Sequence, residues 1–160
     1  MAWASVGRMA ADESIRSRFA DIPTPSFSDV PVSVPPPLAE ATVAIVTTAG
    51  LRPAGEVKLW PGTDSSFQVL PAPARDVQLS HASPNFDRSG FAADLNVAYP
   101  VDRLEEMAAA GEIGGVASHH LSFMGAQADA TFSTILLDSG PAAAKVLLDL
   151  GADVVLLTPV

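Results

Sequence analysis

Apolar runs and helical stripes alternate along most of the chain after residue 41. The run TVAIVTTAG at residues 42–50 is β-branched and apolar without alternation, which is typical of a strand buried on both faces of a parallel sheet. Gly50 lets the chain turn where this strand ends. The stretches FQVLP (67–71) and DVQLS (76–80) predict two more short strands. We therefore expect a sheet with residues 42–50 as a central parallel strand.

Helical spacing is clearest at residues 99–115. Pro100 precedes this segment, Asp102 favours a first helical turn and Gly111 ends the helix. One stripe of the helix is apolar and consists of Val101, Leu104, Met107 and Ala108. The next stretch, GGVASHHLSFMGA, predicts a strand and a turn, whereas DATFSTILLDSG at residues 129–140 fits helix and strand equally.

A helix and a strand are predicted for the last part of the chain. Ser139 or Gly140 caps this helix, Pro141 occupies its first turn and Gly151 ends it. The residues expected to be buried are Val146, Leu147 and Leu150. DVVLLTPV then returns as a parallel strand with apolar surface and an edge left exposed.

The order of these elements predicts an α/β fold, an open and mostly parallel sheet flanked by helices and incomplete at its C-terminus. Two segments are expected. Residues 1–40 form an amphipathic arm, with Ile15, Phe19 and Ile22 at helical spacing, and a proline-rich linker. Residues 41–160 form the α/β body.

The charge and the composition narrow the functions open to this protein. A net charge of −9 repels phosphate backbones and anionic lipids, so we expect no nucleic acid or membrane partner. The first residues lack the pattern of a signal peptide and no apolar run is long enough to span a membrane, which favours a cytoplasmic protein. The absence of cysteine excludes disulfides and thiol nucleophiles within these 160 residues.

A polar stretch at residues 81–96 follows a predicted strand directly and is expected to be a long irregular loop of functional kind. It contains His81, Asp87 and Arg88. Arginine can bind a carboxylate and aspartate an ammonium group, so the loop suits a small zwitterion. The alternative is that these polar side chains only cap turns.

His119 and His120 are neighbours on a predicted strand and so point to opposite faces. This geometry does not favour a shared metal ion, and no metal site is expected. One of the two histidines can face a cleft as an acid, a base or a ligand-binding group.

Three further candidates have a structural alternative. Asp102 suits a helix start whether or not it contacts a ligand, and Arg103 is spaced to form a solvated pair with Glu106. Met124 can flank a substrate or fill the core beside Phe123.

Several ordered motifs together resemble the selenoprotein B family of glycine, sarcosine, betaine and D-proline reductases. They are VTTAGL, SFQVLP, LSHASPNFDRSGFAADLNVAYPVDRLEEMAAAGEIGGVASHHLSFMG and GADVVLLTPV, and they extend over residues 41–160. Such proteins are components of multisubunit oxidoreductases that cleave a C–N bond of an amino acid or betaine-like substrate. The resemblance implies other reductase subunits as partners, one of them with a pyruvoyl group, and a thioredoxin-like dithiol as electron donor.

In that family a selenocysteine or cysteine follows the strand that matches DVVLLTPV. The resemblance therefore implies that the catalytic residue would follow Val160 and that these 160 residues alone hold no catalytic residue, no cofactor and no activity. A UGA codon read as a stop, a fragment boundary and gene decay all remain open as reasons for the chain end. The positions typical of the family are His81, Asp87, Arg88, Asn96, Asp102, Arg103, His120 and Met124.

Two departures from the family pattern leave the substrate open. Arg52 stands where many relatives have a histidine, and the spacing from His81 to Phe86 is altered. His120 is preferred to His119 as the family histidine because of its spacing to Ser122 and Met124. The competing function is non-catalytic: a domain that binds a small acid or completes a heteromer.

Overall fold

The computed structural model describes Glu13, Ser17, residues 33–55, 64–83, 86, 88–127 and 129–160. The chain divides into two compact units, residues 1–33 and residues 34–160. In the first unit Glu13 and Ser17 are helical, while Ile15, Phe19 and Ile22 of the predicted arm lie outside the described residues. The second unit carries every other element.

A mostly parallel sheet forms the centre of the second unit, as the hydrophobic pattern predicts. Strand β1 (Thr42–Thr47) runs parallel to β7 (Val154–Thr158) on one side. On its other side β1 runs parallel to the short β5 (Gly115–Val116) and then to β6 (His119–Phe123). Because β1 is apolar on both faces and has neighbours on both edges, Val43, Ala44 and Ile45 are buried.

Antiparallel pairs complete the strand arrangement. Strand β3 (Phe67–Pro71) pairs antiparallel with β6 and forms the outer strand on that side. A separate two-stranded ribbon consists of β2 (Leu51–Pro53) and β4 (Val77–Leu79). The open sheet with one antiparallel outer strand confirms the predicted α/β class.

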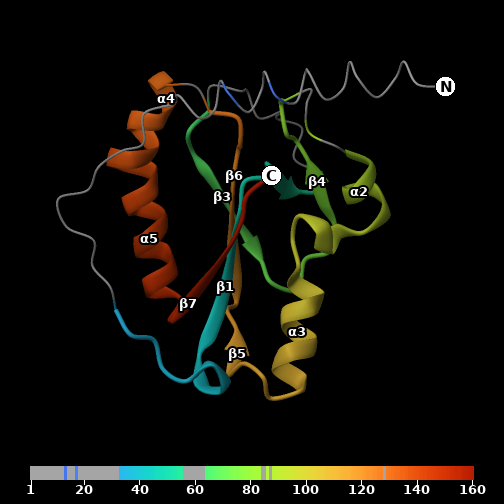
Figure 1. Ribbon diagram of the computed structural model, residues 1–160, viewed down its shortest axis with the longest axis vertical. Helices are drawn as coiled ribbons and strands as arrows, with labels where there is room; N and C mark the ends of the chain where they lie inside the picture. Colours follow the sequence, from blue (N-terminus) through green and yellow to red (C-terminus); the bar gives the residue numbers. More distant parts are fainter. Residues whose placement is uncertain are drawn as a thin grey trace. The chain divides into compact units, whose positions relative to one another are not determined.

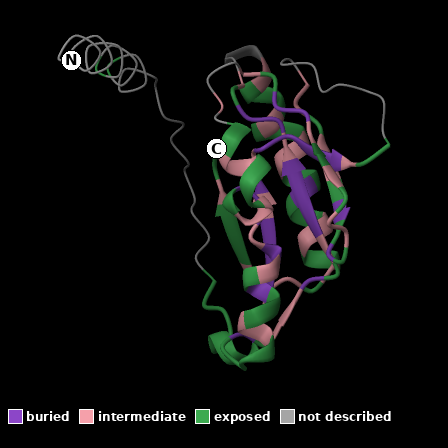
Figure 2. Cartoon of the chain, turned by 90° about the vertical axis from the view of Figure 1, so that its right-hand side faces the viewer, coloured by how far each residue is buried: buried purple, intermediate pink, exposed green. Residues whose placement is uncertain are grey.

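Helices lie on both sides of the sheet, with α3 (Val101–Ala109) on one side and α5 (Gly140–Asp149) on the other (Figure 1). The helix predicted at residues 99–115 is therefore confirmed as α3. Figure 2 shows that buried residues concentrate on the central strands, whereas much of the helical surface is exposed. The remaining helical elements are the 3-10 turn η1 (Leu38–Glu40), α2 (Arg88–Ala93), the 3-10 turn η2 (Leu95–Val97), α4 (Asp129–Thr134) and the π-helical turn η3 (Ile135–Ser139).

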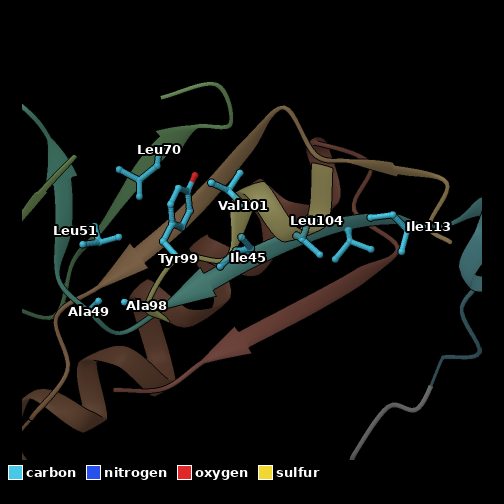
Figure 3. Packing of buried hydrophobic residues seen from close by; sticks show 10 residues of the cluster. Ile45, Ala49, Leu51, Leu70, Ala98, Tyr99, Val101, Leu104 and Ile113 are labelled. Carbon is cyan, nitrogen blue, oxygen red and sulfur yellow. The ribbon is translucent and has the colours of Figure 1, made fainter. Parts of the chain in front are cut away.

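The hydrophobic core lies between the sheet and α3. Val101 and Leu104, two of the four residues in the predicted stripe, are buried, and Met107 and Ala108 pack partly buried against the same cluster. Figure 3 shows the ring of Tyr99 among the surrounding apolar side chains of this cluster. The stripe of α3 thus anchors the helix on the sheet.

The segment that fitted helix and strand equally is helical and runs without a break into α5. Ser139 makes no capping hydrogen bond, so the prediction of a separate helix capped there was wrong. Pro141 has no amide hydrogen and disfavours a regular α-turn before it, which accounts for the widened turn η3 at this point. The buried residue of α5 is Ala143, whereas the predicted Val146, Leu147 and Leu150 are only half-buried.

The polar stretch at residues 81–96 is less irregular than predicted, because it contains α2 and the start of η2. Asp94 stabilises η2 by accepting a hydrogen bond from the amide of Asn96 at 2.9 Å. The side chain of an aspartate before a short turn was available in the sequence as a signal for this element.

Hydroxyl groups tie β1 and β7 to the segment before α3. The carbonyl oxygen of Ala98 accepts hydrogen bonds from Thr47 Oγ1 at 2.8 Å and from Thr158 Oγ1 at 3.1 Å. Thr47 Oγ1 also accepts a hydrogen bond from the amide of Ala49. The ends of two parallel strands are thereby fixed to one point of the chain.

Strand β7 leaves apolar side chains in contact with solvent, as predicted. Leu157 is 67% exposed, and Val155 and Leu156 are each 38% exposed. In the part of the chain that the structure describes, no helix has the length and apolar character needed to cross a membrane.

Candidate functional site

The carboxyl ends of β1, β6 and β7 meet at one edge of the sheet. The amide of Thr48 donates to the carbonyl of Thr158 at 3.2 Å, and the amide of Gly125 donates to the carbonyl of Thr48 at 2.8 Å. The amide of Val160 donates to Thr48 Oγ1 at 2.9 Å. We call the residues Thr48, Gly125 and Val160 the strand-end site. Open α/β sheets bind ligands at this kind of edge.

His81 packs directly against the strand-end site. Its side chain is buried, its ring stacks on Phe86 with 4.7 Å between the ring centroids, and its Nδ1 accepts the amide hydrogen of Ser83 at 3.2 Å. A Cβ atom on Gly125 would lie 2.8 Å from His81 Nε2 and 3.2 Å from the carbonyl oxygen of Val160. Only glycine at position 125 therefore lets the imidazole come this close to the end of β7.

The hydrogen bond at Nδ1 fixes the tautomer of His81. In the neutral ring the proton must be on Nε2, which accepts or donates no hydrogen bond to any described residue. Burial, reinforced by the positive charge of Arg88, lowers the pKa of His81 below its ordinary value. At neutral pH the group facing Gly125 is thus a neutral N–H donor.

Arg88 holds the backbone of the loop that carries His81. Its Nη2 donates to the carbonyl oxygens of His81 at 2.8 Å and Ser83 at 3.3 Å, and its Nη1 donates to that of Phe86 at 3.3 Å. These bonds give Arg88 a loop-shaping role. Asp87, its expected companion, lies outside the described residues, so its role stays a prediction.

A pocket of about 350 Å³ opens beside the strand-end site. Its walls come from the end of β6, the turn that follows it and the helical run α4–η3. The lining includes Thr48, Phe123, Met124, Phe132, Ile135 and Val160. Met124 is buried and its sulfur accepts the amide hydrogen of Ala82 at 3.4 Å, so it joins the pocket wall to the loop of His81.

The turn after β6 contains two pocket residues that the sequence analysis did not select. Gln127 donates from Nε2 to the carbonyl oxygens of Met124 at 2.8 Å and Asp64 at 3.0 Å. Ala126 has φ +54°, a left-handed conformation that is strained for residues other than glycine. The turn is thus held in shape by the amide of Gln127. No pattern in the sequence marks such a position.

His120 lies in the core and not at an open cleft. It has no exposed surface, its ring meets that of Tyr99 edge-on with centroids 5.5 Å apart, and its Nδ1 accepts the amide hydrogen of Ile45 at 3.1 Å. Burial, reinforced by the charge of Arg75, lowers the pKa of His120 to about 4. The expectation that His120 faces a cleft is not met. Strands β5 and β6 pair with β1 on either side of Ile45, and in the gap between them the Ile45 amide donates to the His120 side chain instead of to a strand.

Asn96 and Asp102 fix the start of α3. Asn96 Oδ1 accepts the amide hydrogen of Asp102 at 3.1 Å, and Asn96 Nδ2 donates to Asp102 Oδ2 at 2.8 Å. Arg75 forms ion pairs with Asp102 at 2.6 Å and with Glu105 at 2.7 Å. Hydrogen bonds from Asn96 and Arg75 hold the pKa of the Asp102 carboxyl below its ordinary value. These contacts are those of a helix N-terminus.

The predicted site residues therefore separate into groups. His81, Arg88 and Met124 come together at the strand-end site, while Asn96 and Asp102 form the separate cluster at α3. Arg103 is exposed and pairs with Glu106 at 2.7 Å, which confirms the solvated pair considered from its spacing. Within the described ranges, no three His, Cys, Asp or Glu side chains are grouped so that they could hold a metal ion.

The chain is similar in sequence to D-proline reductase subunit gamma of Acetoanaerobium sticklandii, with 33% identity over 139 residues. The match covers 81% of this chain and 55% of the relative, so the chain spans about half the length of that subunit. This similarity supports a relationship to the reductase family that the motifs resemble. No protein-family model and no solved structure matches the chain.

Proposed function

We propose that the chain is the scaffold portion of a selenoprotein B-type component of an amino acid or betaine reductase. One observation carries the proposal: in a chain related to a D-proline reductase subunit, three parallel strands end beside a buried histidine whose Nε2 faces a glycine. The relative's name supports a role in a reductase that has other subunits as partners, and the family resemblance of the motifs supports a C–N bond as the target.

The arrangement at the strand-end site fits a nucleophile placed directly after Val160. Gly125 allows His81 Nε2 to approach the end of β7, because a Cβ at position 125 would lie 2.8 Å from Nε2 and 3.2 Å from the Val160 carbonyl oxygen. A selenocysteine or cysteine following Val160 would supply the nucleophile for C–N cleavage. His81, neutral and with its proton on Nε2, would donate a hydrogen bond to the anionic form of that residue and favour it. Arg88 keeps His81 in place through the loop carbonyls.

The overall reaction balances through a dithiol. Reductive cleavage of a C–N bond takes up two electrons and two protons, which a thioredoxin-like dithiol supplies when it becomes a disulfide. A partner subunit with a pyruvoyl group would hold an amine substrate, and this chain contributes the strand-end site.

The first experiment is to read the codon after Val160. A UGA followed by an open frame supports the proposal, whereas a continuation without selenocysteine or cysteine refutes it. The second is to produce the chain extended through that residue, with cysteine at the selenocysteine position, together with the partner subunits. Dithiol-dependent formation of the cleaved amine product from D-proline, glycine or betaine is expected, and the same protein with serine at that position is the inactive control.

His81 offers a sharper variant within the same assay. His81→Phe retains a ring to stack on Phe86 but removes the N–H donor, so the rate is expected to fall by about 10²-fold. Normal activity in His81→Phe would contradict the role given to this donor.

A non-catalytic function is the alternative, favoured by the apolar surface of β7 and by the lack of cysteine. In that case the chain completes a heteromer through β7 or binds a small acid without turnover. Activity that depends on the residue after Val160 would exclude this alternative.

A further inference from the structure

The pocket beside the strand-end site is lined mostly by apolar side chains. Phe123, Met124, Phe132 and Ile135 supply an apolar wall, and the described residues that line the pocket include no charged side chain. Burying a carboxylate or an ammonium group among such side chains is strongly unfavourable unless an opposite charge is present. The pocket therefore suits an uncharged hydrocarbon group whose charged ends stay outside it.

The size of the pocket suits a small group. A volume of about 350 Å³ lies near the lower end of the range for small-molecule sites in proteins, roughly 300–1,000 Å³. Thr48 and Val160 line this pocket as well, so a group bound there lies next to the carboxyl ends of β1 and β7.

The walls of the pocket are built from unusual backbone. Ile135 is the first residue of the π-helical turn η3, and π-helical turns are frequent at functional sites. Gly140 makes this turn possible, because a Cβ there would lie 2.5 Å from the carbonyl oxygen of Ile135. Another pocket residue, Ala126, has the strained left-handed backbone, and the contacts of Gln127 hold its turn. Strain of this kind persists where the surroundings fix the backbone.

We propose that this pocket binds the aliphatic ring or chain of the substrate, and that Phe132 and Ile135 set the size of the group it accepts. This inference rests on the proposed function for the identity of the ligand as a substrate. It selects substrates with several contiguous methylene groups over glycine and betaine, whose single methylene group lies between the charged nitrogen and the carboxylate.

Binding can be tested with the chain alone, without turnover. Methyl NMR on ¹³C-labelled Met124 and Ile135 is followed while D-proline, cyclopentanecarboxylate, glycine or betaine is added. The two ring compounds are expected to shift both methyl signals saturably, and glycine and betaine are expected to bind at least about 10-fold more weakly. Equal binding of glycine, or no shift with either ring compound, overturns the proposal.

Two variants locate the ring in the pocket. Ile135→Trp fills the pocket and is expected to abolish the shift of the Met124 methyl, whereas Leu148→Trp, on an exposed position of α5, is expected to leave it unchanged. Circular dichroism checks that both variants fold. If Ile135→Trp does not fold, Phe132→Ala replaces it, because Phe132 is 43% exposed and its loss should shift preference toward cyclohexanecarboxylate. Unchanged ring binding in a folded Ile135→Trp variant, or an unchanged preference in Phe132→Ala, overturns the proposal.

The binding test and the activity test can fail separately. Ring binding in the pocket, without product from the extended protein and its partners, would leave the pocket assignment standing and refute the reductase function. Product formation with no ring binding at Met124 and Ile135 would refute the pocket assignment and leave the reductase function standing.

Discussion

Acid should destabilise this protein through His120 at pH values where carboxylates still carry their charge. The pKa of His120 falls from an ordinary 6.5 to about 4 in the folded chain, because the ring is buried and lies in the field of the positive charge of Arg75. In the unfolded chain the same ring takes up a proton near pH 6.5. The stability contributed by the neutral ring is therefore present above pH 6.5 and is lost as the pH falls toward 4.

The size of this effect follows from the two pKa values. Between pH 7.5 and pH 5.0 the free energy of unfolding should fall by about 2 kcal/mol from His120 alone. The lowered pKa of His81 acts in the same direction. The carboxyls of Asp94 and Asp102, whose pKa values are lowered from an ordinary 3.8, contribute a loss only at lower pH. The interval from pH 7.5 to 5.0 thus isolates the histidines.

The assay is urea unfolding followed by far-ultraviolet circular dichroism at pH 7.5 and pH 5.0. His120→Gln keeps a side-chain oxygen that can accept the Ile45 amide hydrogen but cannot take up a proton in this range. Its pH-dependent loss should be smaller than that of the original chain by about 2 kcal/mol. His119→Gln, at the half-buried neighbouring position, is the matched control and should keep most of the loss, because burial is the main cause of the lowered His120 pKa. An undiminished loss in His120→Gln would refute the reasoning.

Two backbone positions give further predictions, each with a control elsewhere in the chain. Gly114→Ala should lower the free energy of unfolding by about 1–3 kcal/mol, because the new Cβ would overlap the backbone of Glu40, whereas Gly115→Ala meets no atom and should change it by less than about 0.5 kcal/mol. Equal effects at positions 114 and 115 in urea unfolding would contradict this. Ala126→Gly removes strain at φ +54° and should leave the free energy of unfolding unchanged or raised, while Ala108→Gly in the last turn of α3 should lower it by up to about 1 kcal/mol. A loss at Ala126 as large as that at Ala108 would show that no strain is stored there.

Local signals in the sequence were sufficient for the elements that decide the fold. The spacing of apolar residues alone predicts that β1 is buried on both faces and that one stripe of α3 faces the core. The strand, the helix and the parallel sheet could therefore be predicted from these two segments. The helical run that ends in α5 was harder to predict, because Gly140 and Pro141 are typical of the start of a new helix. Their effect in the folded chain is a widened turn inside a continuous one.

The candidate site was predictable in composition but not in geometry. His81 and Arg88 stand in a polar stretch after a strand, and the sequence could select both. His119 and His120 alternate between the two faces of β6, and the sequence does not show which of the two is buried. The break between β5 and β6 decides this, and for that reason His120 was expected at a cleft although it lies in the core. The role of Gln127 arises from carbonyl groups of Asp64 and Met124, and the first of these is 63 positions away in the chain.

The shared acceptor at Ala98 couples regions that are remote in sequence. Thr158 reaches this carbonyl across 60 positions, and Thr47 donates to the same oxygen. When β7 frays, the carbonyl oxygen of Ala98, just before α3, loses the hydrogen bond from Thr158 and keeps the one from Thr47. Amide hydrogen exchange at the beginning of α3 therefore reports on whatever docks along β7, even if the docked molecule never touches that helix.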